Sequence, residues 1–255
     1  MIPICFVFGA GPPPDDPPEI AEQDFVIAAD GGYLYTKNAG IQARIVIGDF
    51  DSLGSDLSGA LAGDADSNPG NGPSGNLGSG PGGDTGDVCT GDPLNDKDNP
   101  LVVSLPKEKD QTDTLAALKC GLEHGFKRFH IYGGAGGRLD HTLANIQCLR
   151  YLLNHGARGY LYDRDVIVTA LRTGVWLAPL EEGIISVFAL GGPASGVCLR
   201  GLKYELENTH LNSDYPLGVS NEFIGRPAYI GMEHGDLLVI YPTGTTEIEG
   251  EFLNG

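Results

Sequence analysis

The segment FHIYGGAGGRLDH, residues 129–141, decides the fold class. Its apolar start predicts a short buried strand and its glycines predict a loop. A helix is expected next, with an apolar stripe of Leu143, Ile146, Leu149, Leu152 and Leu153. The same alternation runs toward the N-terminus, where strands are expected at 4–8, 25–29, 44–47 and 101–105 and helices at 33–39 and 114–125. Apolar runs without polar alternation are typical of parallel strands covered on both faces, so the sequence predicts a doubly wound, mainly parallel α/β domain.

The pattern changes after residue 159, where short strand-like pieces are separated by Gly, Pro and Asn. These pieces lie at 160–162, 165–171, 175–177, 184–190, 197–206, 222–230 and 236–241. They predict a smaller antiparallel β-sandwich, and we divide the chain into domains 1–160 and 161–255. Within the first domain, residues 54–100 are rich in Gly, Ser, Asn, Asp and Pro and are expected to form a disordered insertion.

The charge balance limits the partners of this 255-residue chain. It has 34 Asp and Glu against 16 Lys and Arg, a formal net charge of −18, which argues against nucleic acid and anionic membranes as partners. A polyanionic small substrate would need a cation between itself and the protein. The five cysteines are an odd number without a CxxC pair, so we expect neither a disulfide framework nor a zinc site. This cysteine usage favours a reducing cytosol, and the apolar start of the chain, which lacks basic residues, is expected to be a strand rather than a signal peptide.

Acidic residues recur at the expected ends of strands in the first domain. They are Asp30, Asp49, Asp51, Asp110, Asp113 and Asp140. Ligands of open α/β sheets bind beyond the carboxyl ends of the strands, so these carboxylates are expected near one crevice. Asp49 and Asp51 are two residues apart and point the same way in an extended chain, where Mg²⁺ is the natural cation to bridge them.

Two further features fit a phosphate-bearing ligand. Either Asp110 or Thr112 is expected to cap the helix that begins near residue 114, leaving backbone N–H groups toward the crevice. The loop 133–137 lets backbone amides approach phosphate oxygens, and Arg138 adds a planar cationic fork. Each residue also has a structural alternative: the aspartates as caps and turns, Arg138 in a surface ion pair, and His141 as a local hydrogen-bond partner.

Six motifs in this order carry a resemblance to a known family. They are Ala29-Asp30-Gly31-Gly32, Gly48-Asp49-Phe50-Asp51-Ser52, Lys109-Asp110-Gln111-Thr112-Asp113, Gly137-Arg138-Leu139-Asp140-His141, Gly201-Leu202-Lys203-Tyr204 and Ser220-Asn221-Glu222-Phe223. Together they resemble thiamine pyrophosphokinase over nearly the whole chain except the 54–100 insertion, where relatives usually have a much shorter connection.

The resemblance implies transfer of the terminal pyrophosphoryl group of ATP to the hydroxyl of thiamine, giving thiamine diphosphate and AMP. It also implies a homodimer with active sites shared between subunits. By this resemblance Asp49, Asp51 and Asp113 are Mg²⁺ ligands, Asp30, Thr112, Arg138 and Asp140 are ATP contacts, and Tyr204, Ser220 and Asn221 form the thiamine side. Either Asp110 or Asp140 is a candidate to accept the proton of the thiamine hydroxyl.

Two alternatives stay open at this point. A DxD pair after a strand also occurs in other Mg²⁺-dependent phosphoryl or nucleotide-sugar transferases. A non-enzymatic binding module is the second alternative, with the acids serving solubility and the loops serving a partner. Thiamine-dependent AMP release separates both from the first interpretation.

Overall fold

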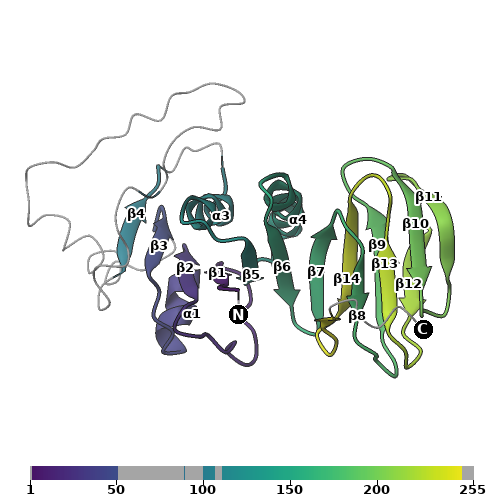
Figure 1. The fold of residues 1–255 in the computed structure, drawn as a ribbon. Helices are drawn as coiled ribbons and strands as arrows, with labels where there is room; N and C mark the ends of the chain where they lie inside the picture. Colours follow the sequence, from purple (N-terminus) through teal and green to yellow (C-terminus); the bar gives the residue numbers. More distant parts are fainter. Residues whose placement is uncertain (1, 51–88, 90–99, 107–110, 249–255) are drawn as a thin grey trace, which may run out of the picture.

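The computed structural model describes residues 2–50, 89, 100–106 and 111–248. Ten strands form one long sheet in the order β12-β9-β14-β7-β6-β5-β1-β2-β3-β4, and five form a second sheet in the order β11-β10-β13-β8-β15 (Figure 1). The first sheet begins with β1 (Cys5–Phe8), β2 (Phe25–Ala29), β3 (Ile45–Gly48), β4 (Leu101–Ser104), β5 (Arg128–Tyr132) and β6 (Arg158–Asp163).

These six strands run parallel, and their order places a topological switch between β1 and β5. From β1 the chain steps outward through β2, β3 and β4, and it then returns to pair β5 with the other side of β1. Two helices, α3 (Asp113–Glu123) and α4 (Leu139–Asn154), cover one face, and α1 (Gly32–Asn38) covers the other. The predicted doubly wound α/β layer is therefore confirmed.

A tight hairpin at Arg164-Asp165 turns the sheet from parallel to antiparallel. β6 pairs with β7 (Val166–Leu171) in antiparallel register, with Asp163 opposite Val166, and Arg164 adopts a φ of 47°. β14 (Leu237–Pro242), β9 (Ile184–Ala189) and β12 (Gly218–Glu222) extend the same sheet. The expected domain division at residue 160 falls inside β6, which pairs with both β5 and β7, and it stays a prediction.

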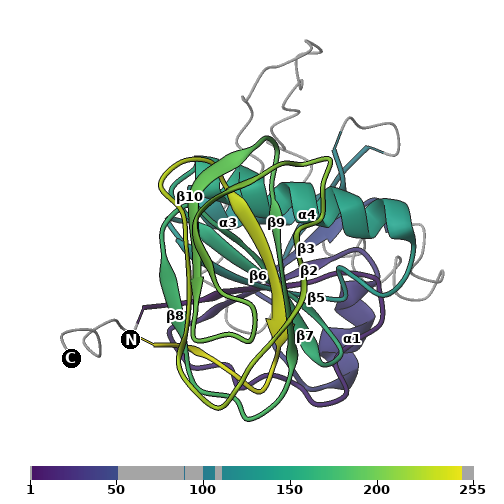
Figure 2. The same cartoon turned by 90° about the vertical axis from the view of Figure 1, so that its right-hand side faces the viewer.

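The second sheet packs on the antiparallel half of the first and completes the predicted sandwich (Figure 2). Its strands are β8 (Val175–Leu177), β10 (Ala194–Arg200), β11 (Leu206–Leu211), β13 (Ala228–Gly231) and β15 (Glu247–Ile248). The apolar core between the two sheets includes Leu177, Val187, Leu199, Ile230 and Val239, all almost fully buried. A second core lies under α3 and α4, and a third lies on the α1 face.

Three local expectations differ from the structure. Leu143 is 55% exposed rather than on the buried stripe of α4, although Leu149 and Leu152 are fully buried. The expected strand 197–206 is two strands, because β10 ends at Arg200 and β11 begins at Leu206. The expected strand 222–230 is also broken: β12 ends at Glu222 and β13 begins at Ala228, with Gly225 (φ 74°) between them.

The sequence argued against a disulfide framework, but the structure contains one disulfide. Cys89 and Cys120 form a disulfide that joins residue 89 to the middle of α3, while Cys5, Cys148 and Cys198 are free thiols. The backbone N–H of Cys89 also donates to the Glu123 carboxylate at 3.3 Å. Apart from Cys89 and Pro100, the expected 54–100 insertion lies outside the described residues. Among the helices of the described residues, none is long and apolar enough to cross a membrane.

Candidate active site

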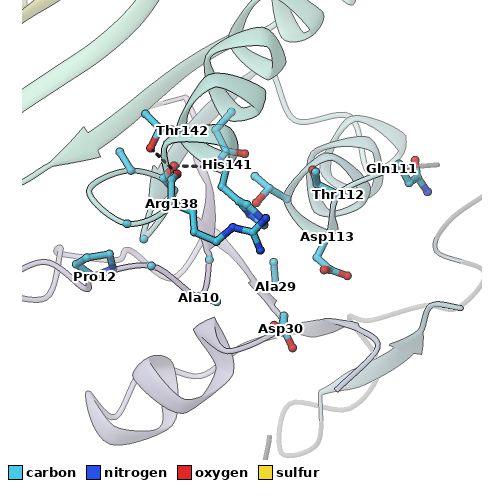
Figure 3. Close-up of a pocket in the computed structure, with 18 residues that line it drawn as sticks. Ala10, Pro12, Ala29, Asp30, Gln111, Thr112, Asp113, Arg138, His141 and Thr142 are labelled. Carbon is cyan, nitrogen blue, oxygen red and sulfur yellow. Dashed lines mark hydrogen bonds between the residues drawn. The ribbon is translucent and has the colours of Figure 1, made fainter. Parts of the chain in front are cut away.

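A pocket of about 540 Å³ lies at the switch between β1 and β5 (Figure 3). Its walls come from the segments that follow β1, β2 and β5 and from the first turns of α3 and α4. The residues in these walls are Gly9–Pro12, Ala29, Asp30, Gln111–Thr114, Gly133–Ala135, Gly137, Arg138, His141, Thr142 and Asn145. The crevice expected beyond the carboxyl ends of the strands is therefore present, at the position where open α/β sheets bind ligands.

The floor of the pocket is bare backbone. The N–H of Gly11 donates to the carbonyl of Gly133 at 2.8 Å, and the N–H of Gly9 donates to Tyr132 at the same distance. A Cβ on Gly11 would lie only 2.5 Å from the carbonyl oxygen of Gly133, so the two loops approach each other closely because both carry glycine. A surface without side chains lets phosphate oxygens come close to the main chain.

Thr112 caps α3, which resolves the choice between Asp110 and Thr112 for this role. Its hydroxyl oxygen accepts a hydrogen bond from the N–H of Leu115 at 3.2 Å, while its backbone is extended. The first turn of α3 therefore begins at the pocket wall with Asp113 as its acidic residue. Since α4 also begins at this wall, the positive ends of two helix dipoles lie beside the pocket, which favours an anionic ligand.

Arg138 and Asp140 form a two-pronged ion pair at the start of α4. The guanidinium donates to the two carboxylate oxygens of Asp140 at 2.6 and 3.1 Å, and both side chains are mostly exposed. Hydrogen bonding to Arg138 lowers the pKa of Asp140 to about 2. Figure 3 shows Arg138 and His141 reaching over the pocket from α4, with Thr112 and Asp113 facing them from α3.

Asn145 holds the glycine-rich loop from inside the protein. It is 4% exposed, and its amide donates to the carbonyl of Gly134 at 2.7 Å. A buried polar side chain on an apolar helix face needs such a partner, because leaving it unpaired costs free energy. Asn145 thereby fixes the loop 133–137 against α4.

The predicted acidic residues are distributed around the pocket in a defined way. Asp30 and Asp113 line it, and Asp140 flanks it through Arg138. Asp49 follows β3, one strand beyond Asp30, and the Cα of Asp30 lies 3.1 Å from the position of a Cβ on Gly48. Asp51 and Asp110 lie outside the described residues. Within the described part of the chain, no three His, Cys, Asp or Glu residues form a group able to hold a metal.

The residues expected on the thiamine side lie in the other half of the molecule. Ser220 and Asn221 belong to β12, the edge strand of the long sheet, and Tyr204 lies in the β10–β11 connection, in contact with Asn221. β12 is separated from β5 by five strand spacings, which at about 4.8 Å each amount to roughly 24 Å. The structure thus brings Tyr204, Ser220 and Asn221 together but leaves them far from the pocket of the same chain.

Several pocket residues were given no role by sequence reasoning. The clearest are Gly9, Gly11 and Asn145, followed by Gln111 and Thr142. The glycines directly after the first expected strand were a usable signal, because a glycine-rich turn at a strand end permits close approach of a ligand. Asn145 was a weaker signal: one polar residue in the helical stripe that carries Leu149 and Leu152.

Family comparisons agree with this geometry. The family described as "Thiamin pyrophosphokinase, catalytic domain" matches residues 93–161, which contain α3, the glycine-rich loop and α4. The family described as "Thiamin pyrophosphokinase, vitamin B1 binding domain" matches residues 177–235, which contain Tyr204, Ser220 and Asn221. The two matches together span just over half of the chain.

Individual relatives give the same result. A thiamine pyrophosphokinase of Bacillus subtilis is 32% identical over 138 residues, covering 53% of this chain and 64% of the relative. Thiamin pyrophosphokinase 1 of Caenorhabditis elegans is 29% identical over 140 residues, covering 50% of this chain and 56% of the relative. The chain therefore aligns with less than two thirds of the length of these curated relatives. A crystal structure of a Bacillus subtilis thiamine pyrophosphokinase superimposes with a TM-score of 0.72 at 25% identity, over 94% of this chain and 99% of that one.

Proposed function

Because the chain belongs to the thiamin pyrophosphokinase family, we propose that it transfers the pyrophosphoryl group of ATP to the hydroxyl of thiamine, releasing AMP. One observation carries the proposal: the pocket between β1 and β5 combines a backbone floor, two helix N-termini and Arg138, a set suited to a polyphosphate. The match of residues 177–235, which contain Tyr204, to the vitamin B1 binding domain of the family also supports the proposal.

In this proposal the residues of the pocket act by positioning and by charge. Backbone N–H groups of the loop 133–137 and the first turn of α3 bind phosphate oxygens, with Thr112 holding that turn in helical geometry. Arg138 binds the charge that develops on the departing AMP, and Asp140 orients its guanidinium by the two-pronged ion pair. Phosphoryl transfer needs mainly this kind of placement and electrostatic stabilisation.

We include Mg²⁺ in the proposal, held by Asp49, Asp51 and Asp113. The donor chemistry fits, because Asp113 lines the pocket, Asp49 follows Gly48, which lies beside the pocket residue Asp30, and Mg²⁺ prefers such hard carboxylate ligands. When bound, the ion neutralises phosphate charge. The strongly acidic chain, with its net charge of −18, supports the proposal of a cation between protein and nucleotide.

The ion pair between Arg138 and Asp140 bears on which aspartate, Asp110 or Asp140, accepts the proton of the thiamine hydroxyl. Asp140, with a pKa of about 2, is a weak base because Arg138 stabilises its ionised form. We therefore assign Asp140 to orienting Arg138 and keep Asp110 as the candidate acceptor for the hydroxyl proton.

We propose that the thiamine half of the site comes from a second copy of the chain. Tyr204 contacts Asn221 of β12, and the roughly 24 Å between β12 and β5 is more than one thiamine molecule, two linked small rings with a hydroxyethyl arm, spans. A homodimer in which β12 and Tyr204 of one subunit face the pocket of the other removes this gap. An aromatic ring suits thiamine, which presents a flat pyrimidine and a cationic thiazolium.

Exposed apolar side chains support this pairing. At the start of α4, beside the pocket, Leu139 and Leu143 are 72% and 55% exposed. On the sandwich half, Tyr204, Tyr215 and Leu217 are 57%, 66% and 46% exposed. In a twofold dimer the first group of one subunit covers the second group of its partner, and the reverse contact occurs by symmetry.

A cytoplasmic location is part of the proposal, since both proposed substrates are soluble metabolites. The disulfide between Cys89 and Cys120 gives this part of the proposal a direct test, because the cytosol keeps most thiols reduced. Labelling of free thiols in protein taken directly from cells determines which state occurs there.

The function is tested by incubating purified protein with ATP, thiamine and Mg²⁺ and separating the nucleotides. The proposal predicts AMP and thiamine diphosphate in equal amounts, with neither formed when thiamine is omitted. ADP, free phosphate or a nucleotide sugar as the product would instead support another Mg²⁺-dependent transferase. Arg138→Ala in the same assay should lower kcat/KM for ATP by about a hundredfold or more, since it removes a charge that stabilises the transition state.

A further inference from the structure

Asn221 makes an unusual set of contacts for a residue of a substrate site. Its side-chain oxygen accepts hydrogen bonds from the backbone N–H groups of Tyr204 and Glu222, both at 2.9 Å. Its amide nitrogen donates to the carbonyl of Tyr204 at 2.6 Å. Three of the four hydrogen-bonding positions of this amide are thus used by the protein, and Asn221 is only 3% exposed.

The backbone of Tyr204 is consequently held through both its N–H and its carbonyl, while its side chain stays largely exposed to solvent. Asn221 binds both the N–H and the carbonyl of this one residue, as a neighbouring strand would. The neighbouring Lys203 adds two more hydrogen bonds to the segment that follows Asn221. Its N–H donates to the carbonyl of Glu222 at 3.0 Å, and its ammonium donates to the Glu222 carboxylate at 2.7 Å. The Tyr204 side chain itself is 57% exposed.

The buried neighbours fix the same connection in the core. Leu202 is 2% exposed and pairs with Phe223, which is 3% exposed, in an isolated antiparallel bridge between the two sheets. The two residues that precede Tyr204 are therefore anchored to the two residues that follow Asn221. The ring of Tyr204 projects from this segment, with the Lys203 ammonium 5.4 Å from the centroid of the ring.

We propose that Asn221 is a positioning residue, which holds Tyr204 as a rigid platform for thiamine and does not itself contact the substrate. This inference rests on the proposed function, and it separates two residues that the family resemblance places together on the thiamine side. Rigid presentation matters because a ring that is already ordered loses little conformational entropy when a ligand stacks on it.

A double-mutant cycle tests whether Asn221 acts through Tyr204. Asn221→Ala and Tyr204→Ala should each lower kcat/KM for thiamine by about tenfold, with KM for ATP changed less than about twofold. The kcat/KM of the double variant for thiamine should equal that of Tyr204→Ala within about twofold, because Asn221 has no ring left to position. If the loss of kcat/KM in the double variant is the product of the two single losses, Asn221 makes a separate contact with thiamine and the proposal is overturned.

Asn221→Asp distinguishes the two roles by charge. A carboxylate in direct contact with thiamine would attract its cationic ring and keep or lower KM for thiamine. If Asn221 instead only positions Tyr204, the aspartate variant places a carboxylate oxygen against the Tyr204 carbonyl in place of the 2.6 Å hydrogen bond. KM for thiamine should then rise, as in Asn221→Ala. Asn38→Ala, at an exposed position at the end of α1, is the matched control and should leave both constants unchanged.

A measurement without turnover keeps this inference separate from the proposed function. Hydrogen exchange of the peptide around residues 201–206 should be faster in Asn221→Ala than in the wild type or in Asn38→Ala. Unchanged exchange overturns the positioning role whether or not the protein turns over thiamine, whereas absent AMP formation by the wild type contradicts the function alone. If Asn221→Ala does not fold, Asn221→Ser replaces it in both experiments.

Discussion

The Asn145 side chain donates a 2.7 Å hydrogen bond to the carbonyl of Gly134, and so ties the glycine-rich loop after β5 to the helix that follows it. The contact is buried, and it joins the floor of the proposed ATP pocket to α4. The geometry of the backbone that is proposed to bind phosphate therefore depends on a side chain that lies behind it.

Asn145→Ala should loosen this loop. The buried carbonyl of Gly134 loses its partner, which costs about 1–3 kcal/mol of stability and lowers the melting temperature by several degrees. KM for ATP should rise, whereas KM for thiamine should change little. Thermal unfolding and ATP titration measure both effects, with Gln147→Ala on the exposed side of α4 as the control. An Asn145→Ala protein as stable as the control would contradict this role.

Asp140→Asn tests the assignment of Asp140 to orienting Arg138. Since hydrogen bonding to Arg138 lowers the pKa of Asp140 to about 2, the carboxylate stays ionised at all pH values above that. Its titration therefore cannot produce an acidic limb in a profile of kcat against pH between about 4 and 9. The variant should lower kcat/KM for ATP about tenfold while any acidic limb stays at the wild-type pH. Loss of that limb in Asp140→Asn would identify Asp140 as the base.

Asp236 links helix α4 electrostatically to the antiparallel half of the long sheet. Its carboxylate accepts hydrogen bonds from Arg172 at 2.7 Å and from Arg150 of α4 at 3.0 Å, and these bonds, Arg172 first, lower the pKa of Asp236. A depressed pKa contributes stability that is present at neutral pH and is lost as the pH falls below the usual carboxylate range. Asp236→Asn should thus cost about 2–3 kcal/mol at pH 7, and progressively less at pH 4 and below.

Denaturant unfolding at several pH values measures this dependence. Glu207→Gln is the control, because its ion pair with Arg200 is exposed on both sides and should contribute little. A stability difference for Asp236→Asn that stays constant from pH 7 to pH 3 would rule out the titration of Asp236 as its source.

The disulfide between Cys89 and Cys120 should stabilise the fold. The two cysteines are 31 residues apart, and closing a loop of that length in the unfolded chain is worth about 3–4 kcal/mol in the chain-entropy description. Cys89→Ser should lower the melting temperature, and a dithiol reductant should do so in the wild type but not in Cys89→Ser. Cys198→Ser, which changes a free thiol, serves as the control. A reductant that lowers both melting temperatures equally would contradict the prediction.

The α/β half could be predicted from sequence because each of its strands is a short, uninterrupted apolar run. β1, β2, β4 and β5 lie within a residue or two of their expected bounds, since glycine or polar turns follow them directly. The sandwich strands were harder to delimit, because half-buried strands such as β11 mix polar and apolar residues. Leu143 was misplaced for a different reason: helical spacing shows that a leucine lies on a face, but it does not show where the covering sheet ends.

The candidate site also contains residues that could be predicted from the sequence and contacts that could not. Asp30, Thr112, Asp113 and Arg138 could be gathered in advance, because parallel strands bring their carboxyl ends to one edge. The partners of Asn145, Asn221 and Cys89 could not, since each contact joins segments whose separation depends on the folded packing. Nor does the sequence show that Tyr204 lies five strands from the pocket, because strand order in the sandwich is a long-range property.

The shared active site is the central claim, and mixing two variants that are each impaired in a different half of the site tests it most directly. Arg138→Ala impairs the pocket and Tyr204→Ala impairs the platform. Each variant is expressed and purified, and the two are then unfolded and refolded together in equal amounts. If every site combines the pocket of one subunit with the platform of the other, half of the dimers are mixed and one of the two sites in each is intact. Activity should then return to about a quarter of the wild-type level. A mixture no more active than the two variants assayed separately would contradict the account.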